Sequence, residues 1–409
     1  MTTLTRTSKI GALLLALGGC SLDVNYPSVI DASTFDPSQD AATLSLSAQS
    51  NLYRALASVI PASGFFSQEV LVGAVRQETN DIGRRVATAG TPDINSALWA
   101  PIQRSIATNE LTIGVLDDGP GAATDVNLAR AYMNSGFSFV LMAEHFCEGA
   151  FLSGPPLTTA QVLDTAVARF TRAVATAAAA SGAEAVKIVN ASNVGLARAL
   201  LQKKDYAAAA IAAALVPAAF TYNAIAVDDA TNRALANGVF TGDLSAIIIV
   251  PEAYRNLNDP RVLWQDGGKN AQDSQFRYYQ QLKYPSYASP TRIASGLEAA
   301  YILAEAKLQT GDPAPALALI AAQRAANGQP PFTGTGTPAI LAELMDQRAR
   351  EFWREAKHVG DWVRNPTATP YVGAAGTPYY KPAQGAFGAS NCLPIPLAEV
   401  NANPNFPKS

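Results

Sequence analysis

Apolar side chains recur at helical spacing along most of the chain. The first example runs from Leu44 to Val59, where apolar residues follow one another at intervals of three or four, the spacing of one face of an α-helix. Stretches with the same period follow at 99–116, 125–146, 158–174 and 340–356. The spacing therefore predicts an all-α protein.

A second regularity is an internal repeat. Residues 196–209 align with residues 303–316, with Leu, Ala and Asp at matching positions. Each copy predicts a helix, a short turn whose Asp (Asp205 or Asp312) can cap the next helix, and a second, Ala-rich helix. This pattern predicts helical hairpins similar to tetratricopeptide pairs, although the full tetratricopeptide signature is incomplete.

Residues 217–291 interrupt the helical pattern between the two copies of the repeat. Aromatic rings cluster there without a helical or strand period, among Gln, Asn, Asp and Arg side chains. Sugars present both C–H faces and hydroxyl groups, so rings flanked by such polar groups are typical of a sugar-binding site. For any single ring, the alternative is that it holds the loop against the helices. The candidate ligand-binding residues of this segment are Trp264, Arg277, Tyr278, Tyr279, Tyr284 and Tyr287.

A second candidate lies in the long excursion over residues 61–95. Its polar stretch between Arg76 and Arg85 contains three residues that can bind hydroxyl groups. Excursions of this length are usually functional or disordered. The candidate contacts here are Glu78, Asn80 and Asp81.

The N-terminus has the layout of a secretory signal. Basic residues precede an apolar run over 10–17, and two glycines precede Cys20. The run is too short to cross a hydrocarbon core of about 30 Å. Small residues before a cysteine resemble a bacterial lipobox, whose cysteine is lipidated. We expect residues 1–19 to be a lipoprotein signal peptide and residues 20–40 a lipidated tether, with cleavage and a free Cys20 as the alternative.

Two further cysteines, Cys147 and Cys392, remain once Cys20 is assigned to lipid. An even number outside the cytoplasm favours one disulfide. The alternative is two buried free thiols, since the sequence cannot show that their Cβ atoms meet.

The charge and the motifs of the chain indicate neither a nucleic-acid-binding surface nor a metal site. The formal net charge is −3 and 15% of the residues are charged, which provides no basic patch for nucleic acid. His145 and His358 are far apart and no HExxH pattern occurs, so neither a metal nor a cofactor is expected. A glycoside hydrolase needs only two carboxylates about 5–10 Å apart, which no spacing rule excludes. These motifs therefore identify no catalytic site, and a lipid-anchored glycosidase remains an alternative.

Three segments of the chain resemble one family. Residues 351–364 read EFWREAKHVGDWVR, residues 393–396 read Leu-Pro-Ile-Pro and precede Glu399 and Asn403-Pro404-Asn405, and residues 301–306 begin a helix pair that leads to Arg324. These segments are similar to the SusD/RagB family of nutrient-uptake lipoproteins. The departures are Ala356 where the family usually has Gly, His358 where it has Arg, and Trp362 where it has Leu.

The resemblance implies a SusD-like scaffold of tetratricopeptide-like hairpins over residues 41–409, with a loop-rich insertion at about 217–291 and the family signature at about 338–406. It also implies cell-surface, non-catalytic binding of an oligomeric nutrient, with a glycan as the favoured class. Delivery to a SusC-like TonB-dependent transporter in the outer membrane would follow, with the lipid anchor holding the protein there. A scaffold that binds only protein is a further alternative, and the sequence does not distinguish a glycan from a peptide ligand.

Overall fold

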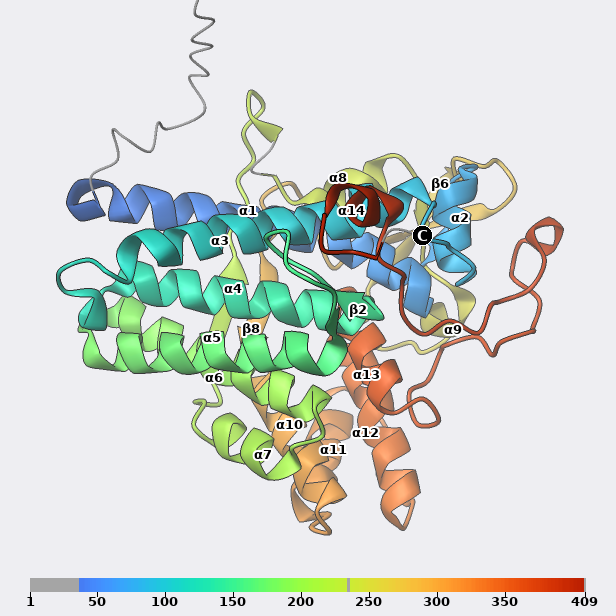
Figure 1. Cartoon of the computed structure of the whole chain (residues 1–409). Helices are drawn as coiled ribbons and strands as arrows, with labels where there is room; N and C mark the ends of the chain where they lie inside the picture. Colours follow the sequence, from blue (N-terminus) through green and yellow to red (C-terminus); the bar gives the residue numbers. More distant parts are fainter. Residues whose placement is uncertain (1–36, 234–235, 408–409) are drawn as a thin grey trace, which may run out of the picture. The chain divides into compact units, whose positions relative to one another are not determined.

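The computed structural model describes residues 37–407 except 234–235, and it shows an all-α protein, as predicted (Figure 1). The longer helices are α1 (Pro37–Ser67), α3 (Ala100–Leu116), α4 (Val126–His145), α5 (Thr159–Ala179), α6 (Ala183–Gln202), α10 (Gly296–Gln309), α11 (Ala314–Ala326) and α12 (Thr337–Glu351). The shorter helices are α2 (Gln77–Gly83), α7 (Tyr206–Ala214), α8 (Gly238–Leu244), α9 (Glu252–Arg255), α13 (His358–Arg364) and α14 (Leu397–Ala402).

Five long helices enclose the main hydrophobic core. Figure 1 shows α1, α3, α4, α5 and α6 stacked in layers, and α4 is buried at every position from Leu128 to His145. Phe170 of α5 lies between α4 and α6. A Cβ atom at Gly136 or Gly195 would come within 2.8 or 2.2 Å of the Phe170 ring. Glycine at these two positions therefore lets both helices close on the ring.

Local signals in the sequence act where they were expected. At the start of α5, the Thr158 hydroxyl accepts from the Gln161 amide at 3.3 Å and the Gln161 side chain accepts from the Thr158 amide at 2.9 Å, which completes the capping box. The two repeats form the hairpins α6–α7 and α10–α11. Asp205 caps α7 through the Ala208 amide at 3.1 Å.

The strands are short and pair antiparallel in the described part of the chain. The pairs are β1 (Leu71–Val72) with β5 (Ile248–Ile249), β2 (Glu148–Gly149) with β3 (Leu157–Thr158), β4 (Thr221–Ala224) with β8 (Thr291–Ser295), and β6 (Trp264–Asn270) with β7 (Arg277–Gln281). The β1–β5 pair attaches the 61–95 excursion to the predicted insertion. The two segments chosen as ligand-binding candidates are thus brought together.

Some boundaries differ from the sequence prediction. The predicted signal peptide, Cys20 and most of the tether lie outside the described residues, and α1 begins at Pro37, within the segment predicted as tether. The helix predicted over 340–356 ends at Glu351, because Arg354 and Ala356 adopt left-handed backbone angles, with φ of 60° and 55°. Over the described residues, no helix combines the length and apolarity needed to cross a bilayer.

Candidate ligand-binding site

Two of the predicted ligand-binding rings belong to the core. Tyr278 of β7 is 3% exposed and its hydroxyl donates to the Asp243 carbonyl at 2.9 Å. Tyr284 is 2% exposed and donates to the Arg354 carbonyl at 3.0 Å. Burial raises the pKa of both phenols, to about 12 for Tyr278. The prediction is corrected for these two residues, which hold the insertion against the helices.

Two other rings of the same hairpin remain partly exposed. Trp264 and Tyr279 meet edge to face with their centroids 5.6 Å apart. The Arg255 guanidinium, from the end of α9, lies 3.6 Å from the Tyr279 centroid and 5.5 Å from that of Trp264. We call Arg255, Trp264 and Tyr279 the ring platform. Such a cation over aromatic faces is a stable arrangement that leaves the outer edge of the guanidinium available.

Polar groups surround the ring platform. Gln265 and Gln280 are joined by a hydrogen bond of 2.9 Å across the hairpin. Arg277 pairs with Asp266 at 2.8 Å, and both side chains are about half exposed, at 43% and 50%. The hydrogen bond from Arg277 lowers the pKa of Asp266, which keeps this carboxylate ionised. Arg277 thus lies at the predicted site, but its charge is already neutralised.

Tyr287 lies apart from the ring platform. Its ring contacts Phe240 of α8 edge to face at 4.9 Å, and the Arg233 guanidinium lies 3.8 Å from its centroid. A cavity of about 340 Å³ nearby is lined by Arg233 and by Tyr53 of α1, among others. The structure therefore does not group Tyr287 with the other predicted rings.

The two predicted segments meet at a small pocket. The Asp273 amide donates to the Gly73 carbonyl at 2.8 Å, which places the β6–β7 turn beside the 76–85 stretch. The pocket measures about 180 Å³. Its polar lining residues are Asn80, Asp273, Gln275, Lys381 and Gln384. We call it the junction pocket.

Within the junction pocket, hydrogen bonds and one ion pair fix the polar groups. Asn80 donates to the Ala74 and Arg76 carbonyls at 3.1 and 2.7 Å, whereas its own carbonyl oxygen accepts no hydrogen bond from the described residues. Lys381 lies 2.7 Å from the Asp273 carboxylate and also donates to the Ala74 carbonyl at 2.8 Å. The unpaired acceptor of Asn80 could take a hydrogen bond from a ligand.

The remaining candidates of the second segment lie at the surface of α2. Asp81 pairs with Arg84 at 2.7 Å, and Glu78 approaches Arg76 only to 4.0 Å. Sequence reasoning did not select Arg255 or Lys381. The composition around Lys381, Tyr379-Tyr380-Lys381 within a Pro/Gly-rich region, resembles the predicted aromatic segment and was the available signal.

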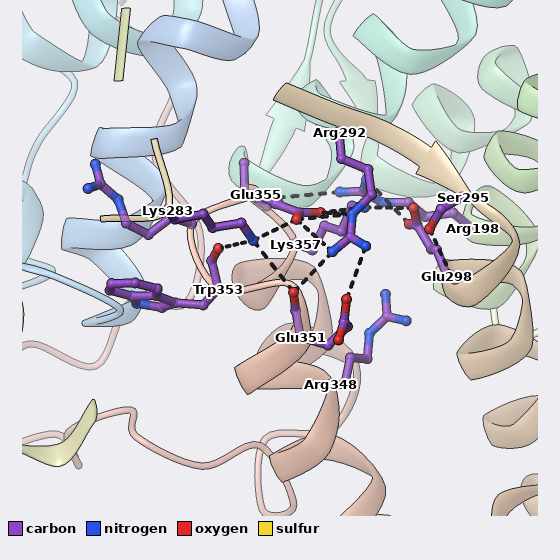
Figure 2. A network of polar contacts seen from close by, with 12 residues as sticks. Arg198, Lys283, Arg292, Ser295, Glu298, Arg348, Glu351, Trp353, Glu355 and Lys357 are labelled. Atoms are coloured by element: carbon purple, nitrogen blue, oxygen red, sulfur yellow. Dashed lines mark hydrogen bonds and ion pairs between the residues drawn. The ribbon is translucent and has the colours of Figure 1, made fainter. Parts of the chain in front are cut away.

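Figure 2 shows a network of charged side chains around Glu355. Glu355 accepts from Lys283 and Arg292, both at 2.7 Å, and from Lys357 at 3.1 Å. Lys357 also pairs with Glu298 at 2.7 Å. Burial opposes ionisation of Glu355, but the three cations outweigh it and hold its pKa well below the usual range. The network joins α10, β8 and the segment after α12.

Residues 267–408 match the SusD family. A solved SusD superfamily protein from Parabacteroides distasonis has the same fold, with a TM-score of 0.72 at 14% identity, over 92% of this chain and 99% of that chain. The C-terminal third of the chain therefore resembles the SusD family, and the chain has the fold of SusD-like proteins.

Other SusD-like structures also share the fold. A SusD-like carbohydrate binding protein from Bacteroides vulgatus is 15% identical, with a TM-score of 0.70, over 92% of this chain and 99% of that chain. Surface glycan-binding protein A from Bacteroides thetaiotaomicron, in complex with laminarihexaose, is 13% identical, with a TM-score of 0.66, over 89% of this chain and 97% of that chain. No curated protein matches the chain.

The structure explains the departures from the SusD/RagB signature at residues 351–364. Ala356 has a φ of 55°, a left-handed conformation that glycine adopts without strain. Burial lowers the pKa of His358 to about 4, so this residue is neutral where the family carries an arginine. Asp361 instead pairs with Arg348 at 2.6 Å and Arg364 at 2.9 Å. Asp361 of this segment is thus paired with two arginines although residue 358 carries no charge.

Cys147 and Cys392 form a disulfide in the structure, with Cα atoms 5.1 Å apart. The Cys147 amide donates to the Leu393 carbonyl at 3.0 Å, and the Leu393 amide donates to the His145 carbonyl at 2.8 Å. These contacts attach the Leu-Pro-Ile-Pro segment of the SusD/RagB signature to the end of α4.

Proposed function

We propose that this chain binds an oligosaccharide at the ring platform and the junction pocket, without altering it. The observation that carries the proposal is the difference in burial among the aromatic rings of residues 264–284. Tyr278 and Tyr284 are buried, whereas Trp264 and Tyr279 remain partly exposed beside Arg255 and a row of amides. The laminarihexaose complex of a protein with this fold supports a glycan as the ligand class.

Binding would combine two kinds of contact. The C–H faces of a sugar pack on partly exposed rings, and its hydroxyl groups need donors and acceptors nearby. Gln265, Gln280 and the outer edge of Arg255 supply these groups at the ring platform. The unpaired carbonyl oxygen of Asn80 supplies an acceptor at the junction pocket.

The state of the nearby carboxylates favours binding without hydrolysis. A glycosidase needs one carboxyl group that holds a proton and a second that acts as nucleophile or base. Asp266 is paired with Arg277 and its pKa is lowered, and Asp273 is paired with Lys381. Asp266 is therefore not suited to hold a proton at neutral pH, and Asp273 is already engaged in an ion pair.

Alanine substitutions at the ring platform test the proposal. Trp264→Ala and Tyr279→Ala should each weaken binding by about 1–3 kcal/mol, because each removes a ring that contacts the sugar. Binding to a panel of oligosaccharides that includes laminarihexaose, and to a peptide panel, would be measured by calorimetry. Tyr287→Ala is the matched control, since this ring is also partly exposed but contacts Phe240 edge to face, away from the platform.

Melting curves separate loss of contact from loss of fold. Tyr284→Ala should lower stability by about 3–5 kcal/mol, as expected for a buried ring. Unchanged affinity in both platform variants, with normal melting, would remove the platform from the site. Shortened oligosaccharides in the incubation would favour the hydrolase alternative, and binding of peptides alone would favour a protein scaffold.

We also propose that the protein is anchored by lipid at Cys20 and delivers its ligand to a SusC-like TonB-dependent transporter in the outer membrane. The signal layout and the family resemblance support this. Cys20→Ala should release the protein from the membrane fraction, because the acyl chains contribute about 0.8 kcal/mol per buried CH₂. Recovery of a large TonB-dependent barrel with the lipidated protein, but not with a lipidated control protein, would support the partnership. Unchanged membrane retention of the variant would contradict the lipid anchor.

A further inference from the structure

Arg85 is a buried cation without a carboxylate partner. Arg85 is only 3% exposed, and it forms no ion pair within the described part of the chain. Its Nη2 atom donates to the Gly373 carbonyl at 2.5 Å, whereas Nε and Nη1 have no hydrogen-bond partner. Arg348, Arg354 and Arg364 are equally buried, and each pairs with a carboxylate.

Two aromatic rings hold the guanidinium of Arg85. Its central carbon lies 5.0 Å from the Trp362 centroid and 5.0 Å from the Phe387 centroid. The backbone of Arg85 is also held in a left-handed conformation, with φ of 61°. An arginine remains charged even when buried, so such a site is costly unless something neutralises it. Its retention in a strained conformation points to a ligand that supplies the missing charge.

A cavity of about 230 Å³ lies beside Arg85 and Trp362. Small residues form much of its lining, together with Pro366 and Val372. These small residues are Gly373, Ala374, Ala375, Gly388 and Ala389. The Gly388 amide donates to the Arg84 carbonyl at 2.7 Å, so this loop is attached directly to the backbone that carries the guanidinium.

We propose that this Arg85 pocket binds a carboxylate group of a ligand. A guanidinium packed against two rings keeps its N–H groups in one plane, which matches the two oxygens of a carboxylate. The ligand carboxylate would displace the Gly373 carbonyl from Nη2 and also accept from Nη1. Two sources share this chemistry, the carboxylate of a uronic acid and the C-terminal carboxylate of a peptide. The site is distinct from the ring platform and the junction pocket.

Thermal melts and calorimetry of the purified full chain would test the proposal with paired probes. Glucuronate is compared with neutral glucose, and trialanine with its C-terminal amide. A carboxylate that binds the folded chain should raise the Tm with its concentration, and the counterpart that lacks the carboxylate should not. A rise in Tm with glucuronate would indicate a uronic acid as the ligand, and a rise with trialanine would indicate a peptide C-terminus.

Arg85→Met keeps an apolar stem but removes the charge, and should weaken carboxylate binding by about ten- to a hundredfold. Arg104→Met is the matched control, since Arg104 is an exposed arginine on α3 and should leave binding unchanged. Trp362→Leu introduces the residue usual in the family, so it is expected to fold, and it should also weaken binding by removing one of the two rings. This second variant keeps the test decisive if Arg85→Met does not fold.

Three results would overturn the proposal. They are the absence of any carboxylate effect in the wild-type chain, an equal effect in Arg85→Met, and an equal effect in Trp362→Leu when Arg85→Met does not fold. Binding of neutral oligosaccharides at the ring platform should be the same in wild type and Arg85→Met. A failure of the Arg85 pocket is therefore distinguishable from a failure of the proposed glycan site.

Discussion

The charge network around Glu355 and the hairpin that carries the ring platform both contain ion pairs, but the two sets of pairs differ in their exposure to water. Glu355 has a side chain that is 1% exposed and meets three cations. Asp266 and Arg277 of the hairpin pair at a similar distance but are about half exposed. Water screens the exposed pair, whereas burial makes each partner of Glu355 necessary. Burial, more than distance, separates charges that hold the fold from charges that a ligand can reach.

The hydrogen-bond partners show the same contrast. Lys283 donates both to Glu355 and to the Trp353 carbonyl, each at 2.7 Å, so its ammonium group has two partners within the protein. The Arg255 guanidinium lies over two aromatic rings, and its charge also acts on the half-exposed Asp266. The first arrangement fixes the turn after α12, and the second leaves donors for a ligand.

The largest expected effect is on the stability of the fold, and it comes from removing the disulfide. Replacing Cys147 and Cys392 together by Ser should lower the free energy of unfolding by about 4–5 kcal/mol in the chain-entropy model, because the bridge closes a loop with a sequence separation of 245. Urea unfolding of wild type and variant gives the difference. Mass spectrometry of a non-reduced digest checks the pairing, and two freely alkylated thiols in the native protein would contradict it.

Glu355→Ala should cost about 3–5 kcal/mol of stability, because it removes the buried carboxylate that Lys283, Arg292 and Lys357 share. Asp266→Ala is the matched variant on the hairpin. It removes an exposed carboxylate that is also paired at short range, and its stability should be indistinguishable from wild type. Equal destabilisation of the two variants in urea unfolding would break the comparison.

A smaller effect on stability should come from Glu69, a buried carboxyl group that differs from Glu355 in its partners. This carboxyl group accepts from the Arg354 amide at 3.1 Å, but its second oxygen has no partner. Burial raises its pKa to about 8, against the opposing effect of the Arg354 amide. The folded chain therefore keeps a proton that the unfolded chain loses near its ordinary value of 4.5.

The sign of the pH dependence follows from this proton. The stability contributed by neutral Glu69 is present below pH 4.5 and declines as the pH rises towards about 8. Glu69→Gln has no carboxyl proton to lose, so it should remove the decline. At pH 8 it should be more stable than wild type by about 1–3 kcal/mol, because the ionised Glu69 of wild type has a buried oxygen without a partner. Urea unfolding at pH 5, 6.5 and 8 measures it, and parallel pH profiles in the two proteins would contradict the raised pKa.

The sequence alone determined the features that depend on near neighbours. Apolar spacing defined the helices, Thr158 and Gln161 defined the start of α5, and residues 351–364 indicated the family. Contacts three or four residues apart decide such features, so they can be deduced from a local pattern. The pairing of Cys147 with Cys392 was expected from their number, and the structure supplied the proximity.

Only the tertiary structure decided which rings are buried and which charges are paired. Tyr284 is held by the Arg354 carbonyl 70 residues away, whereas Trp264, in the same stretch of sequence, stays partly exposed. The break after Glu351, the meeting of Gly73 with Asp273, and the isolation of Arg85 likewise depend on distant partners. A tyrosine or arginine has the same local pattern whether or not a partner packs against it. Exposure and charge pairing are set by long-range packing, which no local period in the sequence encodes.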